Sequence, residues 1–189
     1  MNTFKEIFSK YDTDKTDNFS EAYNQLFTPI RNDIQLIFEI GVNRGGSIRA
    51  WKEFFPNAKI VGMDIEPNTY FEDDRISIEI GDASDKFFAL NMIKKYGYPD
   101  ILIDDGSHFS SDIKKSLEIF FPYVKKCYVI EDIGTQTNLY KNGFYINDNA
   151  PATNNVCENA VSLMCQKDFD IKSIHIYYSI CFMFKKEII

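Results

Sequence analysis

The 189-residue sequence has no apolar run long enough to cross a membrane, and it does not begin with the basic and apolar segments of a secretory signal. Positive charge is also in deficit, because 21 Lys and Arg stand against 28 Asp and Glu, a formal net charge of -7. Binding nucleic acid without regard to sequence requires a basic surface that displaces phosphate counterions. We therefore expect a cytoplasmic protein that binds neither a membrane nor nucleic acid.

Cysteine and histidine are scarce. The cysteines, which form no Cys-x-x-Cys pair, are Cys127, Cys157, Cys165 and Cys181. A structural zinc site is therefore not expected, and we interpret the cysteines as buried, reduced thiols. With 189 residues, 44% of them hydrophobic, the chain can form one domain with a full core over residues 1–189. We expect an N-terminal helical cap (1–35) and an α/β core (36–189) within it.

Two common nucleotide-binding motifs are missing from the glycine-rich turn that follows the apolar run 36–40. Gly41, Gly45 and Gly46 do not have the G-x-G-x-x-G spacing of dinucleotide sites, and no Lys-Ser/Thr follows them as in a P-loop. Glu39 would also repel a phosphate placed at this turn. The pattern favours an adenosine-type cofactor that carries positive charge, although an ordinary strand–helix turn is the alternative.

Strand-like and helix-like segments alternate from residue 36 onward. Strands are expected in the apolar runs 36–40, 60–65, 76–82, 100–105 and 128–132, and helices at 48–55, 85–96 and 113–120. This alternation predicts right-handed βαβ units and a parallel sheet with helices on both faces. Because almost nothing separates 171–178 from 180–185, these last strands should form an antiparallel hairpin. The expected fold is α/β, a doubly wound, mostly parallel seven-stranded sheet with a C-terminal antiparallel hairpin.

Two other segments flank this core. Short helices are expected at 4–8 and 22–27, and the polar segment 11–18 between them is, by composition, most simply a solvated loop. The long polar stretch 133–155 follows the fifth strand, so we interpret it as part of the acceptor site.

Acidic residues follow the strands of the predicted parallel sheet. Because the carboxyl ends of parallel strands share one edge, these acids should converge there: Glu39, Asp64, Asp82, Asp104, Asp105, Glu131 and Asp132. Asp64 and its neighbour Ile65 are placed to contact a ribose, and Asp82 and Ala83 an adenine. Glu39 should lie beside the amino end of the cofactor.

Four of these acids form two adjacent pairs, Asp104-Asp105 and Glu131-Asp132. Crowded carboxylates repel one another unless they are protonated or neutralised, and a divalent cation neutralises them. Oxygen ligands suit Mg²⁺, with Mn²⁺ as the alternative. Helix capping could explain single acids but not two pairs.

His108 follows Asp105 by three residues, at the start of an expected helix. An imidazole near the metal could act as a general base and take a proton from a substrate hydroxyl. A purely structural role is the alternative, and it is our interpretation of His175, the other histidine, which lies within a late strand.

An ordered set of motifs resembles one enzyme family over most of the chain. The motifs are Tyr11-Asp-Thr-Asp14-Lys15, Glu39-Ile-Gly-Val-x-x-Gly-Gly-Ser47, Val61-Gly-Met-Asp64, Asp104-Asp105-Gly-Ser107-His108 and Glu131-Asp132. They resemble the metal-dependent O-methyltransferases that act on the sugars of macrolide antibiotics, a group of the class I S-adenosylmethionine (SAM) methyltransferases. The predicted parallel sheet with its terminal hairpin matches the Rossmann-like plan of that class.

The resemblance implies SAM and Mg²⁺ as cofactors and methyl transfer to a hydroxyl. It implies that Asp105, Glu131 and Asp132 hold the metal, with Asp104 as an alternative to Asp105, and that His108 is the base with Asp105 as its companion.

The resemblance also implies a set of cofactor contacts. Those in and near the glycine turn are Gly41, Asn43, Gly45, Ser47 and Asp104. Tyr11 and Lys15 would belong to a lid over the cofactor, which replaces the solvated-loop interpretation of this segment.

The expected acceptor is a hydroxyl of a sugar or glycan-type small molecule, such as a sugar nucleotide, a surface polysaccharide or a secondary metabolite. Metal-independent N-methylation of an amine or amide is one alternative, and SAM binding without catalysis is another. A dinucleotide reductase is disfavoured by the spacing of the glycine turn. The oligomeric state is open, with a homo-oligomer as one alternative.

Overall fold

A computed structural model describes residues 2–15, 19–67, 71, 73–133, 170–177 and 179–186. Its centre is a seven-stranded sheet in the order β3-β2-β1-β4-β5-β7-β6. The strands are β1 (Leu36–Ile40), β2 (Lys59–Asp64), β3 (Ile76–Ile80), β4 (Ile101–Asp104), β5 (Cys127–Ile130), β6 (Ile171–Tyr177) and β7 (Ile180–Lys185). The helices are α1 (Phe4–Phe8), α2 (Ser20–Phe27), α3 (Gly46–Phe54), α4 (Lys86–Tyr96) and α5 (Ser110–Phe120), with short 3₁₀ turns η1 (Thr28–Ile30) and η3 (Phe121–Tyr123).

The sheet confirms the predicted topology. Strands β1 to β5 pair in parallel, and β1 lies between β2 and β4, so the strand order reverses beside β1. Strand β7 is antiparallel to both β5 and β6, which gives the predicted C-terminal hairpin. In such sheets, ligands bind at the carboxyl ends of the strands where the order reverses.

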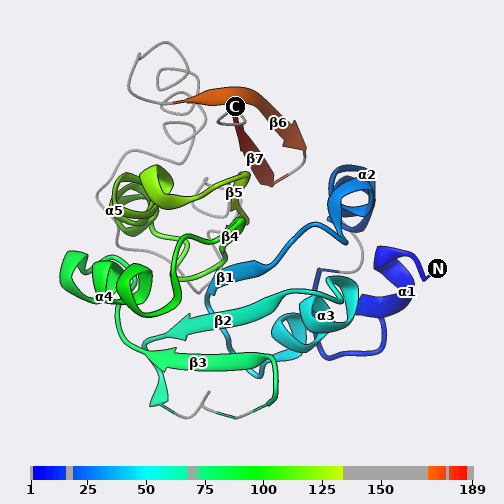
Figure 1. Cartoon of the computed structure of the whole chain (residues 1–189), viewed down its shortest axis with the longest axis horizontal. Coiled ribbons are helices and arrows are strands. Elements are labelled where there is room, and N and C mark those ends of the chain that lie inside the picture. Colours follow the sequence, from blue (N-terminus) through cyan, green and yellow to red (C-terminus); the bar gives the residue numbers. More distant parts are fainter. Residues whose placement is uncertain are drawn as a thin grey trace, which may run out of the picture.

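Helices cover both faces of the sheet (Figure 1). All five residues of β1 are buried, as expected for a central parallel strand that is covered on both sides. Because side chains alternate along a strand, Ile37 packs into the cluster beneath α3, whereas Phe38 packs into the cluster beneath α4 and α5. Glu39 therefore lies on the α3 side, where it is fully buried.

The N-terminal helices belong to the core. The Phe4 ring stacks on Phe8 with ring centroids 3.9 Å apart, and both rings contact Trp51 of α3. Tyr23 of α2 contacts both Trp51 and Phe182 of β7. Helices α1 and α2 thus complete the layer formed by α3, on the face opposite α4 and α5.

Several boundaries differ slightly from the predictions. The second strand ends at Asp64, and Ile65 is 65% exposed.

Cys127 and Cys181 are buried, as predicted. The segment 133–155, apart from Ile133, and both Cys157 and Cys165 lie outside the described residues. Within the described part of the chain, no helix has both the length and the apolar character needed to span a bilayer.

Candidate functional site

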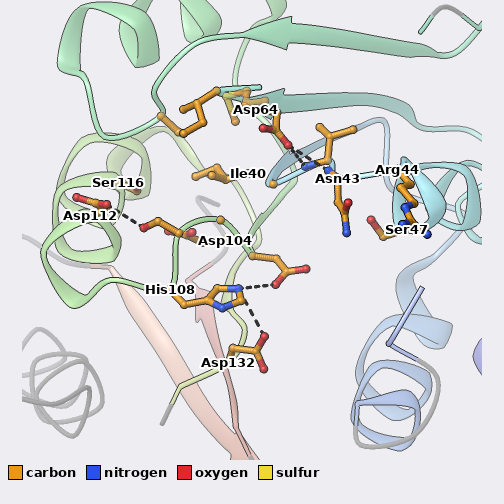
Figure 2. A pocket seen from close by; sticks show the side chains of 18 of the residues that line it. Ile40, Asn43, Arg44, Ser47, Asp64, Asp104, His108, Asp112, Ser116 and Asp132 are labelled. Atoms are coloured by element: carbon orange, nitrogen blue, oxygen red, sulfur yellow. Dashed lines mark hydrogen bonds and ion pairs between the residues drawn. The ribbon is translucent and has the colours of Figure 1, made fainter. Parts of the chain in front are cut away.

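A cavity of about 640 Å³ lies at the carboxyl ends of the parallel strands. Its walls come from residues 12–15, the turn after β1, the ends of β2 and β3, and the segment that leads from β4 into α5 (Figure 2). The predicted site residues that line it are Lys15, Gly41, Asn43, Ser47, Asp64, Ile65, Asp82, Ala83, Asp104, Asp105, His108 and Asp132. A cavity of this size can hold an adenosine-containing cofactor.

Gly41 lets the end of β4 approach the end of β1. Its φ angle is +89°, and a Cβ atom built on it would lie 2.1 Å from the backbone oxygen of Asp105. Only glycine accommodates both the left-handed conformation and this contact. Gly41 therefore brings the Asp105 segment directly beside the turn.

Gly46, the first residue of α3, allows the N-terminal segment to close over the same turn. A Cβ atom at Gly46 would lie 1.9 Å from the backbone oxygen of Asp12. The glycine-rich turn thus accommodates a neighbouring piece of backbone as well as any ligand.

Asp64 holds the turn in place. Its Oδ2 atom accepts hydrogen bonds from the backbone N–H groups of Val42, at 2.8 Å, and Asn43, at 3.1 Å (Figure 2). Its Oδ1 atom accepts a hydrogen bond from the N–H of Glu66. An ionised carboxylate has about four acceptor positions, so Asp64 could still bind the hydroxyls of a ribose.

The end of β3 contributes a second acid to the same side of the cavity. Asp82 accepts a hydrogen bond from the backbone N–H of Ser84, which fixes a tight turn, and Ala83 beside it is buried. With the exposed side chain of Ile65, these residues form a wall that suits the predicted adenine contact.

Asp104 is nearly fully buried at the base of the cavity. The hydroxyl of Tyr128 donates to its Oδ2 atom at 3.1 Å. Burial raises the pKa of Asp104 to about 7, although the hydrogen bond from Tyr128 opposes this rise. Asp104 can therefore carry a proton near neutral pH.

Asp105, His108 and Asp132 converge at the edge of the cavity. Nε2 of His108 lies 3.2 Å from Oδ1 of Asp105 and 3.5 Å from Oδ2 of Asp132 (Figure 2). Burial lowers the pKa of the His108 imidazole, but its hydrogen bond to Asp105 and the charges of both carboxylates leave that pKa above its ordinary value. Burial raises the pKa of Asp105, but Lys15 and His108 outweigh this effect and hold it below its ordinary value.

The same three residues fit a divalent cation. Each offers a ligand atom, and these atoms all lie within 4.8 Å of one another. Carboxylate oxygens suit both Mg²⁺ and Mn²⁺, and an imidazole nitrogen is a better ligand for Mn²⁺ than for Mg²⁺. Asp105 and Asp132 are therefore the carboxylates best placed to hold the cation.

Glu131 lies outside this group of three. Its Oε2 atom is 2.7 Å from Nζ of Lys15, and its Oε1 atom accepts a hydrogen bond from Tyr23. Burial raises the pKa of Glu131 to about 8, against the opposing charge of Lys15. Glu131 thus points to Lys15 and Tyr23, whereas Asp132, which has a left-handed φ angle of 54°, lines the cavity.

Four predicted site residues do not line the cavity: Tyr11, Glu39, Gly45 and Glu131. Tyr11 donates its hydroxyl hydrogen bond to Glu53 of α3. Glu39 is buried and accepts hydrogen bonds from Ser47 and Trp51, so it supports the turn from beneath. Gly45 caps the N-terminus of α3 with a φ angle of 73°.

Backbone strain is concentrated at the cavity. Asn43, His108 and Asp132 have φ angles of 48°, 59° and 54°, a conformation that costs about 1 kcal/mol or more in a residue other than glycine. All three line the cavity. Strain of this kind persists where the surrounding structure holds a side chain in a particular place.

Several residues that line the cavity were not predicted as contacts, although three of them lie within the motif 11–15 that the resemblance identified. Asp12, Thr13 and Asp14 line the cavity beside Lys15, and so do Asp112 and Ser116 of α5. Helical spacing could have identified the last two, because they are four residues apart and so share one face of α5.

A comparison with models of known protein families finds no match. Two curated relatives are the demethylmacrocin O-methyltransferase of Streptomyces fradiae and the mycinamicin VI 2''-O-methyltransferase of Micromonospora griseorubida. Each is 37% identical over 142 residues, which cover 69% of this chain but 36% of the relative. The chain therefore spans about a third of the length of these curated relatives.

A solved structure is similar over almost the whole chain. It is the MycE methyltransferase from the mycinamycin biosynthetic pathway, in complex with Mg, SAH and mycinamycin VI. The TM-score is 0.85 at 30% identity, and the match covers 98% of this chain and 55% of that one. The chain thus has the Rossmann-like methyltransferase fold and is a relative of the macrolide-sugar O-methyltransferases, within the class I SAM-dependent methyltransferases.

Proposed function

We propose that this chain binds SAM in the cavity and, with a divalent cation, transfers a methyl group to a hydroxyl of a sugar or glycan-type acceptor. One observation carries this proposal: His108 lies between the carboxylates of Asp105 and Asp132 at the edge of a cavity built on the Gly41 turn. A base, a cation site and a cofactor cavity are thereby brought together.

The charge of the cavity supports SAM as the cofactor. The described lining holds eight aspartates: Asp12, Asp14, Asp64, Asp82, Asp104, Asp105, Asp112 and Asp132. Its cationic residues are Lys15 and Arg44, with His108 as a titratable group. Such a surface attracts the sulfonium and ammonium charges of SAM and repels the pyrophosphate of a dinucleotide.

Specific contacts would hold SAM and the divalent cation. Asp64 would bind the ribose, Asp82 and Ala83 the adenine, and Asn43 and Ser47 the amino-acid end of SAM. Asp105 and Asp132 would hold Mg²⁺ or Mn²⁺. When bound, SAM supplies an electrophilic methyl group, and the cation supplies positive charge that favours the deprotonated form of an acceptor hydroxyl.

His108 would act as the general base. Its imidazole would take the acceptor's hydroxyl proton at Nδ1, because the hydrogen bond from Nε2 to the Asp105 carboxylate requires a proton on Nε2, and the charges of Asp105 and Asp132 would stabilise the resulting imidazolium. The acceptor oxygen forms a bond to the methyl carbon as the carbon–sulfur bond breaks, and the electron pair of that bond stays on sulfur. Asp105 holds the ring in place through the hydrogen bond at 3.2 Å.

The proposed acceptor class rests on the relatives, which are O-methyltransferases of demethylmacrocin, of mycinamicin VI at its 2'' position and of a rhamnosyl tetracenomycin at its 2' position. We propose the same chemical class for this chain, a hydroxyl on a sugar carried by a small molecule or glycan. Because the relatives are much longer, their individual acceptors are not carried over, and a homo-oligomer is part of the proposal only as an alternative to a monomer.

Mass spectrometry tests this function. The protein is incubated with SAM, Mg²⁺ and a panel of glycosides, oligosaccharides and sugar nucleotides, and each acceptor is examined for the mass of one added methyl group. We expect methylation of a hydroxyl, and we expect this methylation to be abolished when EDTA removes the cation. Methylation of an amine that persists in EDTA would favour the metal-independent alternative, and SAM binding without methylation of any acceptor would favour a binding protein.

A further inference from the structure

Two polar residues of α5 line a part of the cavity to which the proposed function assigns no contact. Asp112 and Ser116 are four residues apart, so their side chains share one face of the helix, with Cβ atoms about 5–6 Å apart. Figure 2 shows both on the α5 side of the cavity. One offers a carboxylate and the other a hydroxyl, so together they present an acceptor and a donor of hydrogen bonds.

Ser116 is buried but has no hydrogen-bond partner within the described part of the chain. Its exposed fraction is 3%, yet it lines the cavity, and no hydrogen bond joins its hydroxyl to another described residue. Buried hydroxyls normally have a partner, because an unpaired polar group loses its bonds to water without compensation. A molecule inside the cavity is the partner that this hydroxyl can reach.

Asp112 makes hydrogen bonds of its own and still has acceptor positions left. Its Oδ2 atom accepts from the hydroxyl of Ser107 at 2.8 Å, and its Oδ1 atom accepts from that of Ser111 at 3.4 Å. An ionised carboxylate has about four acceptor positions, so Asp112 can also accept from a ligand. An acid in the first turn stabilises a helix by itself, but that role does not require a polar residue at Ser116.

The adenine end of SAM would lie beside this face of α5. Asp64 is placed for the ribose, and Ile65 and Ala83 form the wall that suits the base. Asp82 precedes α4, and Asp112 lies in the first turn of α5. Because α4 and α5 pack on the same face of the sheet, both acids are brought to the same side of the cavity.

Adenine has a pattern of donors and acceptors that matches this pair. Its N6 amine donates hydrogen bonds, and the neighbouring N7 nitrogen accepts one. The amine has two hydrogens, so Asp82 can accept one while Asp112 accepts the other, and Ser116 can donate to N7. A purine with an oxygen at position 6 would place that oxygen against the carboxylate of Asp112, with no hydrogen between them.

We propose that Asp112 and Ser116 recognise the adenine base of the cofactor. Asp112 accepts a hydrogen bond from the N6 amine, and Ser116 donates one to N7. They are specificity-determining residues, because they select adenine over a purine that carries an oxygen at position 6. This inference rests on the proposed function in one respect, namely that the cavity holds SAM.

Ligands that differ only in the base test the role of Asp112. Isothermal titration of the whole chain with Mg²⁺ measures the Kd of S-adenosylhomocysteine and of S-inosylhomocysteine, in which an oxygen replaces the N6 amine. The wild type should prefer the adenosyl ligand by about 10- to 100-fold. Asp112→Asn should reduce this preference by at least about fivefold, because an amide can donate to the oxygen.

Glu118→Gln is the matched control for Asp112→Asn. It removes the same charge from the same helix, at an exposed residue that pairs with Lys114. This control should keep the preference of the wild type.

A 7-deaza analogue of S-adenosylhomocysteine, in which a C–H group replaces N7, tests the role of Ser116. Ser116→Ala should weaken binding of S-adenosylhomocysteine by about 2- to 10-fold, because one hydrogen bond is lost. Its affinity for the 7-deaza analogue should equal that of the wild type, since this ligand has no N7 acceptor.

The ratio of two dissociation constants is the decisive quantity, because a loss of stability weakens both ligands alike. An unchanged ratio in Asp112→Asn, or an equal loss of both ligands in Ser116→Ala, would overturn the proposal while cofactor binding in the cavity stands. If the wild type binds none of these ligands, the proposed function fails and this inference fails with it.

Discussion

Nε2 of His108 lies 3.2 Å from Oδ1 of Asp105, three residues earlier in the chain. Gly41 allows the turn after β1 to pack against the backbone of Asp105. This contact fixes the position of the backbone from which the Asp105 carboxylate extends. The strained backbone of His108, with a φ angle of 59°, then turns the ring toward it. The two residues therefore act as one unit, and the predictions below test that unit and its supports.

His108→Ala should reduce methyl transfer by about 100- to 10,000-fold, because general bases contribute acceleration of that size. SAM affinity should change little, since the loss affects proton removal. The rate of formation of S-adenosylhomocysteine and a SAM titration measure the two effects.

His175→Ala is the matched control for this loss. His175 lies in β6 and contacts Ser173 and the Phe184 ring, outside the cavity. The control should retain the wild-type rate. Equal losses in the two variants would argue that His108 is structural.

Asp132→Asn should weaken Mn²⁺ binding by at least about tenfold, because an amide replaces a charged ligand of the proposed cation site. Isothermal titration with Mn²⁺ measures this change. Asp73→Asn, which alters a surface pair with Lys52, is the control and should bind Mn²⁺ as the wild type does. Unchanged affinity in Asp132→Asn would move the cation site elsewhere.

Gly46→Ala should displace the N-terminal segment, because its Cβ atom would lie 1.9 Å from the backbone oxygen of Asp12. Overpacking of this kind costs about 1–3 kcal/mol, and part of that cost should appear as weaker SAM binding. Gly97→Ala is the control for backbone strain without displacement of a neighbouring segment. The φ angle of Gly97 is +89°, but a Cβ atom there would meet nothing within 4 Å. The Gly97 variant should lose stability and keep its SAM affinity.

Tyr23→Phe should lower the free energy of unfolding by about 1–3 kcal/mol, because it removes a buried hydrogen bond to Glu131. Tyr11→Phe removes a more exposed bond to Glu53 and should cost less than about 1 kcal/mol. Urea denaturation compares the two. A large loss of SAM affinity in Tyr11→Phe would instead support the cofactor contact that the sequence predicted for Tyr11.

The stability of the metal-free protein should depend on pH through Asp104. Burial raises the pKa of Asp104 from its ordinary 3.8 to about 7, so the folded state binds more protons than the unfolded state between these values. Stability should therefore be greatest at the acid end of this window and fall as the pH rises through it, by about 1.4 kcal/mol per unit of pKa difference.

Asp104→Asn removes this titration and should flatten the dependence. Glu39 and Glu131 contribute in the same direction, since burial raises the pKa of each, to about 7 and about 8, so part of the slope should persist. Chemical denaturation at several pH values measures the slope. A stability that rises with pH in this window would contradict the assignment.

The alternation of strand-like and helix-like segments predicted the parallel sheet, and the short spacing between the last two strands predicted the terminal hairpin. The rule that the carboxyl ends of parallel strands share one edge predicted the position of Asp105 and His108. All of these depend on local sequence patterns. The separation of Glu131 from Asp132 could not be predicted from strand alternation, because both residues follow the end of β5 and Asp132 has a left-handed φ angle of 54°. Which of the two faces the cavity depends on Tyr23 and Lys15, which lie more than a hundred residues earlier in the chain.

The role of the N-terminal segment could not be predicted from composition. Residues 11–15 are polar and look solvated, yet Lys15 is buried because three carboxylates from distant strands surround it. Such a charge cluster has no periodicity along the sequence. Family resemblance alone indicated that the segment belongs to the site.

Diffraction from crystals grown with Mn²⁺ and S-adenosylhomocysteine would test the site most directly. An anomalous Mn²⁺ peak should lie within coordination distance of the Asp105 and Asp132 carboxylates, with the cofactor product between the Gly41 turn and Asp82. An absent peak, or one beyond coordination distance of both Asp105 and Asp132, would contradict this arrangement.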